Sequence, residues 1–246
     1  MLLCRDGDEV IAITQPAHAW VSGQLARAWG NAAFGVVEPW EEVCLGAEQH
    51  DVGMTAWERA PTLNPDTGLP RSFMELTIDE HLAMWSSAAG LVAPQSRYAA
   101  LLVSLHGTAL YERRDLSRLA PADAERIRAF LAGQNVLQHQ LRASLHADGA
   151  QVHRNQRLVW TWDSLSLGLL LGWAPYEIER VPAAGGEVTL ALREGTLDPW
   201  PFGAPAVALR CEGRRFRGPF EDEAEMRVAL AAAPWETIEI ALSERL

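Results

Sequence analysis

Six side chains that can ligate a metal are spread along segments that we predict to be helical. His50 and Asp51 are adjacent, and the other four lie on either side of that pair. In chain order the six are His18, His50, Asp51, His81, His106 and Asp163. Helices that each supply one imidazole or carboxylate to a shared centre commonly build metal sites, and these donors suit Fe, Mn or similar divalent ions. The sequence therefore predicts one or two divalent metal ions in the protein core.

Two of these residues stand in strongly apolar surroundings. Asp163 lies in the segment VWTWDSLSLGLLL, and His106 lies in the segment LLVSLHG. An unpaired buried carboxylate lowers stability by several kcal/mol, so Asp163 needs a cation, a metal or several hydrogen bonds. The same reasoning applies more weakly to His106. In contrast, His139, His146 and His153 lie in polar stretches, and we expect them to face solvent.

Further residues near these segments are candidates for catalysis and substrate binding. Asp51 is expected to orient or bridge the attacking water, and Glu58 is a candidate general base or hydrogen-bond acceptor behind the ligands. Gln15, Trp57 and Arg97 are candidate substrate contacts, with Arg97 binding a phosphate and Trp57 forming a pocket wall. Structural roles remain open for each: a solvated acid for Glu58, an ion-pair partner for Arg97 and a core aromatic for Trp57.

The elements that must position these residues are mostly helices in the middle of the chain. Apolar residues recur there with helical spacing, Thr77 and Glu80 have capping-box spacing, and Pro16 and Pro121 suit helix starts. Helices are predicted over about 16–29, 41–50, 77–88, 94–114, 121–147 and 150–173. Residues 58–76 contain three prolines and are predicted to form a long ordered loop over the helices.

Strands are predicted at both ends of the chain. Two β-prone runs flank the Asp6-Gly7-Asp8 turn, which predicts a hairpin within residues 1–14. Later segments alternate with period two, with a turn at Glu212-Gly213 and a short helix between them. These strands are predicted over 187–194, 206–216 and 236–244, and the helix over 221–234. We expect the N-terminal hairpin and the C-terminal strands to form one antiparallel sheet, which gives an α+β fold class.

We predict a single domain over residues 1–246. Its parts are a helical metal-site body at about 15–178, N-terminal strands at 1–14 and a C-terminal β-rich part at 179–246.

The order of the ligand candidates resembles that of the HD superfamily of metal-dependent phosphohydrolases. In that superfamily a first His, an adjacent His-Asp pair and a late Asp hold one metal; His18, His50, Asp51 and Asp163 match them, and Val52-Gly53 continues the HDxG pattern. Members with two metals add two intervening histidines, which the resemblance assigns to His81 and His106. It also implies an HD-like all-helical bundle accompanied by a small antiparallel sheet.

A second resemblance extends over nearly the whole chain. The segments ITQPAHA, SGQLA and WG, then HDVG with Trp57-Glu58, Ser104-Leu105-His106 and the run DPWPF at 198–202, are similar to a bacterial family catalogued as domain of unknown function 3891. Met54 stands where an aromatic residue is expected. This resemblance implies a fold and a site but no particular reaction.

Composition restricts the partners and the chemistry. The net charge is −11, which argues against nucleic acid or an anionic membrane as a partner and leaves a small-molecule substrate. No lysine occurs, which excludes Schiff-base chemistry and a phosphate-binding lysine. Three separated cysteines and the acidic start MLLCRDGDEV predict a cytoplasmic protein without a disulfide framework or signal peptide.

Three functions fit these features. The first is a metal-dependent hydrolase of HD type that acts on a small phosphoester. The second is a dinuclear iron oxygenase with the same ligands. The third is a non-catalytic ligand-binding protein on an HD-like bundle. The sequence leaves the oligomeric state undetermined.

Overall fold

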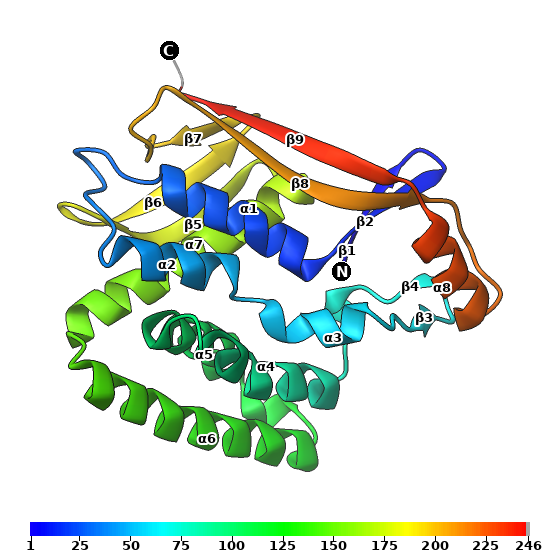
Figure 1. Ribbon diagram of the computed structural model, residues 1–246, viewed down its shortest axis with the longest axis horizontal. Helices are drawn as coiled ribbons and strands as arrows, with labels where there is room; N and C mark the ends of the chain where they lie inside the picture. Colours follow the sequence, from blue (N-terminus) through cyan, green and yellow to red (C-terminus); the bar gives the residue numbers. More distant parts are fainter. Residues whose placement is uncertain (245–246) are drawn as a thin grey trace.

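A computed structural model describes residues 1–244. Helices and sheets form distinct layers (Figure 1), with α1 (Gln15–Ala28), α2 (Trp40–Glu48) and α7 (Gly149–Leu170) between the sheets and an outer group of helices. The outer group consists of α4 (Ile78–Val92), α5 (Arg97–Glu112) and α6 (Pro121–Leu145). Helix α1 contacts both α2 and α7, and α5 contacts α2 and α7 from the other side, so the residues these four helices direct inward meet in the interior.

The predicted helix starts are present as local hydrogen bonds. Thr77 and Glu80 form the expected capping box at the start of α4. The hydroxyl of Thr14 accepts a hydrogen bond from the backbone N–H of Ala17 and caps α1. Asp148 does the same for α7 through the backbone N–H of Ala150. These caps fix the starts of the helices that carry His81, His18 and Asp163.

The main sheet joins the two ends of the chain, as expected. Its antiparallel order is β1-β2-β8-β9. Its strands are β1 (Leu2–Asp6), β2 (Glu9–Ile13), β8 (Ala206–Phe216) and β9 (Trp235–Ser243), and α8 (Glu223–Ala232) connects the last two. The predicted turn at Glu212-Gly213 is wrong, because β8 runs through it. A Cβ on Gly213 would lie 2.7 Å from Ile11 Cγ2, so this glycine serves close strand packing rather than a turn.

The prediction of an HD-like all-helical bundle with one small sheet is wrong. A second antiparallel sheet of three strands follows α7, in the order β5-β6-β7. Its strands are β5 (Tyr176–Ala183), β6 (Gly186–Arg193) and β7 (Thr196–Asp198). Their inward side chains, such as Val181 and Leu190, share the core of α1 and α7, so the sheet is a layer of the fold rather than an appendage.

The segment predicted as a long loop contains short elements of its own. After η1 (Val52–Met54) and α3 (Thr55–Glu58) come the two-stranded hairpin of β3 (Leu63–Asn64) and β4 (Leu69–Pro70), and η2 (Phe73–Glu75). A further single turn, η3 (Leu116–Arg118), precedes α6. The predicted domain ends at 246, and Arg245 and Leu246 lie outside the described residues.

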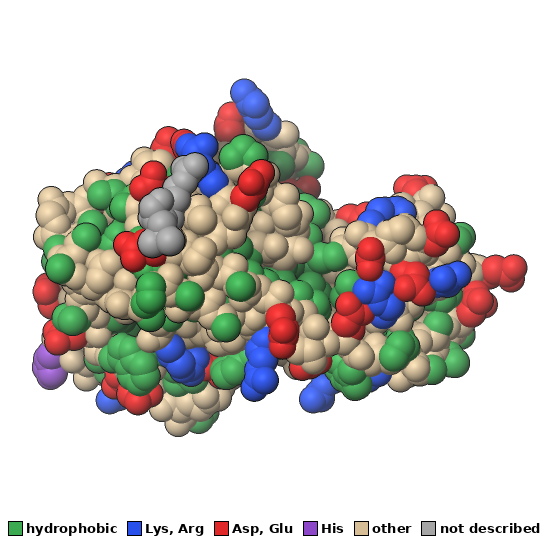
Figure 2. All heavy atoms as spheres, turned by 90° about the horizontal axis from the view of Figure 1, so that it is seen from above, with side chains coloured by type: hydrophobic (Ala, Val, Ile, Leu, Met, Phe, Trp, Pro, Cys, Tyr) green, Lys and Arg blue, Asp and Glu red, His purple; other side chains and the backbone are tan. Residues whose placement is uncertain are grey.

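Charged side chains of both signs are intermixed on the face seen in Figure 2, which views the sheet side of the molecule. Arg215, for example, pairs with Asp6, Glu9 and Glu236 across the main sheet. Within residues 1–244, no helix combines the length and apolarity needed to cross a membrane.

Candidate metal centre

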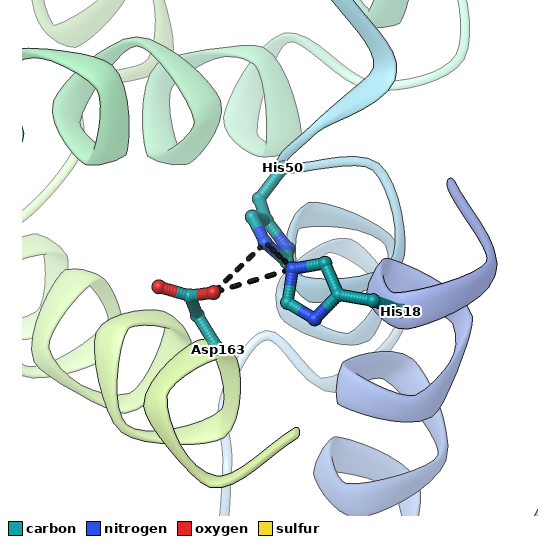
Figure 3. A group of neighbouring side chains, drawn as sticks. All are labelled: His18, His50 and Asp163. Carbon is teal, nitrogen blue, oxygen red and sulfur yellow. Dashed lines mark hydrogen bonds and ion pairs between the residues drawn. The ribbon is translucent and has the colours of Figure 1, made fainter. Parts of the chain in front are cut away.

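Four elements bring five of the six candidate ligands to one buried point. His18 comes from α1, His106 from α5 and Asp163 from α7, while His50 and Asp51 occupy the sharp connection between α2 and η1. All five residues are buried. Figure 3 shows His18, His50 and Asp163 pointing toward one another from three separate segments.

The distances among these side chains are those of ligands around one centre. Nε2 of His18 lies 3.1 Å from Asp51 Oδ2 and 3.3 Å from Asp163 Oδ1. Nε2 of His50 lies 3.5 Å and 3.4 Å from the same two oxygens, and the two Nε2 atoms are 3.2 Å apart. Donor atoms of His18, His50 and Asp163 all fall within 4.8 Å of one another.

Hydrogen bonds at Nδ1 of His18 and His50 allow the lone pair on each Nε2 to face the centre of the cluster. Nδ1 of His50 lies 2.7 Å from the carbonyl of Ala47, which can only accept. Nδ1 of His18 lies 2.6 Å from the hydroxyl of Ser166, which can give its own proton to the carbonyl of Asp163 and accept one from Nδ1. In this tautomer each neutral imidazole donates from Nδ1 and presents an unprotonated Nε2.

The electrostatics of the site favour a bound cation. Burial alone would lower the pKa of His50, but the carboxylates of Asp51 and Asp163 outweigh it and hold that pKa well above its usual value. The pKa of His18 is raised in the same way. Burial would raise the pKa values of Asp51 and Asp163, yet the neighbouring histidines hold both below the usual range. The two carboxylates remain anionic, and the cluster attracts positive charge.

These residues fit a divalent metal ion. Two imidazole lone pairs and two carboxylate oxygens converge in a buried space, and nothing among them donates a hydrogen bond when the histidines are neutral. Such a set of acceptors repels itself unless protons or a metal lie between them. Imidazole nitrogen and carboxylate oxygen are ligands of Fe, Mn and Zn, so His18, His50, Asp51 and Asp163 could hold one ion.

His106 lies at the edge of this cluster. Its Nε2 is 3.6 Å from Asp163 Oδ2, and its ring lies 4.8 Å from that of His50 between centroids. The ring packs between Trp85 and Trp160, and burial lowers its pKa to about 4. Its Nδ1 has no hydrogen-bond partner among residues 1–244. His106 is therefore a neutral imidazole beside the cluster, and neither of its ring nitrogens forms a hydrogen bond within residues 1–244.

His81 faces the same pocket but has both ring nitrogens engaged. The indole N–H of Trp85 donates to its Nε2 at 3.0 Å, so its Nδ1 carries the proton and donates to the hydroxyl of Tyr111. Burial lowers the pKa of His81 to about 4, and the charge of Arg114 adds to this. In this arrangement His81 has no lone pair free for a metal.

Of the remaining predicted site residues, Gln15 lines the pocket, whereas Glu58, Trp57 and Arg97 do not. Gln15 lines the pocket next to His18 and Asp51. Glu58 instead accepts from the backbone N–H of Gln15 and from the amino group of Met1, so its carboxylate supports the start of α1. Trp57 packs against the apolar core around α4 and α5.

Arg97 is not brought to the pocket. It is exposed at the opposite end of α5 and contacts Ser144. Arg114, just beyond the C-terminal end of the same helix, is the arginine that lines the pocket. The sequence contained a signal for the position of Arg114. The helices α4 and α5 are joined by a short loop and therefore run antiparallel. His81, near the start of α4, must then lie beside the end of α5.

His18, Asp51, His106 and Asp163 line a pocket of about 320 Å³, whereas His50 is fully buried. Its walls are largely apolar and come from η1, η2 and the helices, with Met54, Phe73, Leu76 and Leu110 among them. Ser166 is a supporting residue that the sequence reasoning missed. Its signal was a serine three residues after Asp163, on the same face of an apolar helix.

A family model described as "Protein of unknown function (DUF3891)" matches residues 1–217. No curated protein and no solved structure matches the chain.

Proposed function

We propose that this chain, which belongs to the DUF3891 family, is a metal-dependent hydrolase that acts on a small phosphoester. His18, His50, Asp51 and Asp163 would hold one divalent ion, in the ligand order of the HD superfamily. The observation that carries the proposal is the convergence of two imidazoles and two carboxylates beside a pocket. The unpaired cysteines fit a reducing cytoplasm, where we place the protein.

The reaction is hydrolysis of a phosphoester bond. A divalent ion held by these four residues would supply Lewis-acid polarisation and would lower the pKa of a water molecule bound to it. The water oxygen forms a bond to phosphorus while the ester P–O bond breaks, and the leaving alcohol takes up the proton that the water loses. Asp51 orients the water through its carboxylate, and neutral His106 faces Asp163 from the side. Glu58 fixes the start of α1 and thereby positions Gln15 and His18.

Support for a dinuclear iron oxygenase is weaker, because His81 was the residue expected to help hold a second ion. Both of its ring nitrogens are hydrogen-bonded to Tyr111 and Trp85. We therefore propose a single ion. The third alternative, a non-catalytic ligand-binding protein, would have the same pocket. It differs from the hydrolase in metal binding and turnover, which the following test measures.

The test combines metal analysis with hydrolysis of p-nitrophenyl phosphate by protein loaded with Mn(II) or Fe(II). We expect one ion per chain, a metal-dependent rise in melting temperature and metal-dependent release of p-nitrophenol. Asp163→Ala should lose all three, whereas His153→Ala, an exposed change on the same helix, should retain them. Wild-type protein that binds no metal and shows no thermal shift with metal would favour the non-catalytic alternative.

A further inference from the structure

The charges facing the pocket indicate what kind of substrate it accepts. Asp51 and Asp163 contribute two negative charges, which one divalent ion balances. His81 is neutral, because its Nε2 accepts a hydrogen bond from the indole N–H of Trp85. Arg114 is the remaining charged side chain of the pocket lining. The metal-loaded pocket therefore carries one uncompensated positive charge.

That charge is free to meet a ligand. Arg114 forms no salt bridge within residues 1–244, and its guanidinium lies 4.9 Å from the centre of the Tyr111 ring. Stacking on an aromatic ring holds a guanidinium in place while leaving its N–H groups available. An anionic oxygen in the pocket is the natural acceptor for these donors.

Gln15 supplies a second group that lacks a partner. It is 1% exposed, and its buried Oε1 has no hydrogen-bond partner among the described residues. An unsatisfied buried carbonyl oxygen is costly, so a hydrogen-bond donor such as water is expected to bind Oε1 in the pocket. The N–H groups of the same side chain can donate to a phosphoryl oxygen. Glu58 accepts from the backbone N–H of Gln15 with both carboxylate oxygens, which fixes the backbone position from which this side chain extends.

The other walls offer little to a polar substrate body. Met54, Phe73, Leu76, Leu110 and Leu167 have no hydrogen-bonding side chains, and the ring nitrogens of His81 are already taken. A nucleobase or a polyol would bury donors and acceptors against these side chains without partners, which is unfavourable. A compact aryl or alkyl group would bury apolar surface instead.

We propose that the pocket selects phosphomonoesters with a compact apolar ester group, whose phosphoryl oxygens are bound by Arg114 and Gln15. This inference rests on the proposed hydrolase function. It assigns specificity to two residues outside the metal ligands, and it excludes nucleotides and sugar phosphates as preferred substrates.

The test uses metal-loaded protein and measures binding and turnover separately. Binding of phenylphosphonate, a ligand that cannot be hydrolysed, is measured by calorimetry and compared with that of glycerol phosphate and a nucleoside monophosphate. Phenyl phosphate serves as the substrate. The variants are Arg114→Gln and Gln15→Met, and the matched control is Arg113→Gln. Arg113 is the adjacent residue, and its guanidinium stacks over Trp160.

We expect phenylphosphonate to bind more tightly than the two polar phosphates. Arg114→Gln should weaken its binding about tenfold or more, as expected for loss of a charge-assisted hydrogen bond, with unchanged metal content. Gln15→Met should act in the same direction, and Arg113→Gln should match wild type. Equal effects of the two arginine variants, or tighter binding of the nucleotide, would overturn the inference.

Failure of the proposed function gives a different result. If phenylphosphonate binds and Arg114→Gln abolishes that binding, yet no phosphomonoester is hydrolysed, the binding inference is supported and the hydrolase is refuted. If phenyl phosphate is hydrolysed equally well by wild type and Arg114→Gln, the hydrolase is supported and the inference is overturned.

Discussion

The indole N–H of Trp85 donates a 3.0 Å hydrogen bond to Nε2 of His81, one turn away on α4. This contact occupies the nitrogen lone pair that a second metal ion would need. The other ring nitrogen of His81 is bound to Tyr111, from the neighbouring helix α5. His81 therefore forms part of the pocket wall, held by two aromatic residues from two helices.

Metal stoichiometry tests this role for His81. We expect His81→Ala to retain a single ion per chain, like wild type, when loaded with Fe(II) or Mn(II) and measured by mass spectrometry. In parallel, His50→Ala should lose the ion, because Nε2 of His50 faces both carboxylates of the cluster. Two ions in wild type falling to one in His81→Ala would show that His81 changes rotamer to ligate, and would restore the dinuclear alternative.

The residue types of the centre were predictable from the sequence, whereas their hydrogen-bond partners were not. Asp163 in an apolar helix signals a buried charge that needs a partner, and the structure places His18 and His50 beside it. Whether the ring nitrogens of His81 are hydrogen-bonded, in contrast, depends on the rotamers of Trp85 and Tyr111. Spacing along a helix does not encode such rotamers.

The fold shows a similar division. β-Prone runs around Asp6-Gly7-Asp8 predicted the N-terminal strands, and alternating apolar residues predicted the C-terminal ones. Their expected union in one sheet is seen in the pairing of β2 with β8. The sheet formed by β5, β6 and β7 was not foreseen as a layer, since strand pattern alone does not say which face packs on α7. Glycine also misled the prediction at Gly213, where it permits close approach of neighbouring side chains instead of a turn.

Support of His18 by Ser166 predicts a change in metal affinity without loss of the fold. Ser166→Ala removes the acceptor for Nδ1–H of His18 and frees that ring to rotate. We expect metal affinity to fall about 10- to 100-fold, the usual effect of removing such a partner. A competition titration against a chelator measures it, with Ser164→Ala on the same helix as the control. Equal affinity in the two variants would contradict the assigned role.

The buried position of His81 predicts a pH-dependent stability. Its pKa is lowered from 6.5 to about 4, mainly by burial, so the unfolded chain binds a proton over this range more readily than the folded one. Its contribution to stability is therefore complete above pH 6.5 and is lost as the pH falls toward 4, by at most about 3 kcal/mol. His81→Gln should show a shallower loss than wild type in urea unfolding of metal-free protein at pH 7.5 and 5.0. His153→Gln should follow wild type. The same loss of unfolding free energy between pH 7.5 and 5.0 in all three proteins would refute the prediction.

Gly53, the glycine two residues after Asp51, has a packing role that explains its place in the HDVG segment. A Cβ at this position would lie 2.4 Å from the backbone oxygen of Met84, so η1 can approach α4 only without a side chain. Because the contacted oxygen belongs to the backbone of α4, relief of this clash would require η1 or α4 to move, and η1 begins directly after Asp51. We expect Gly53→Ala to lower the free energy of unfolding by about 1–3 kcal/mol and to weaken metal binding.

Gly90 offers a matched control on α4 itself, because nothing lies within 4 Å of a Cβ built there. Gly90→Ala should raise stability by about 0.5–1 kcal/mol, through the better helix propensity of alanine, and leave metal affinity unchanged. Urea unfolding and chelator competition on both variants measure the difference. If Gly53→Ala matches wild type in both measurements, the close approach of η1 to α4 does not position Asp51, and the ligand must be held by other contacts.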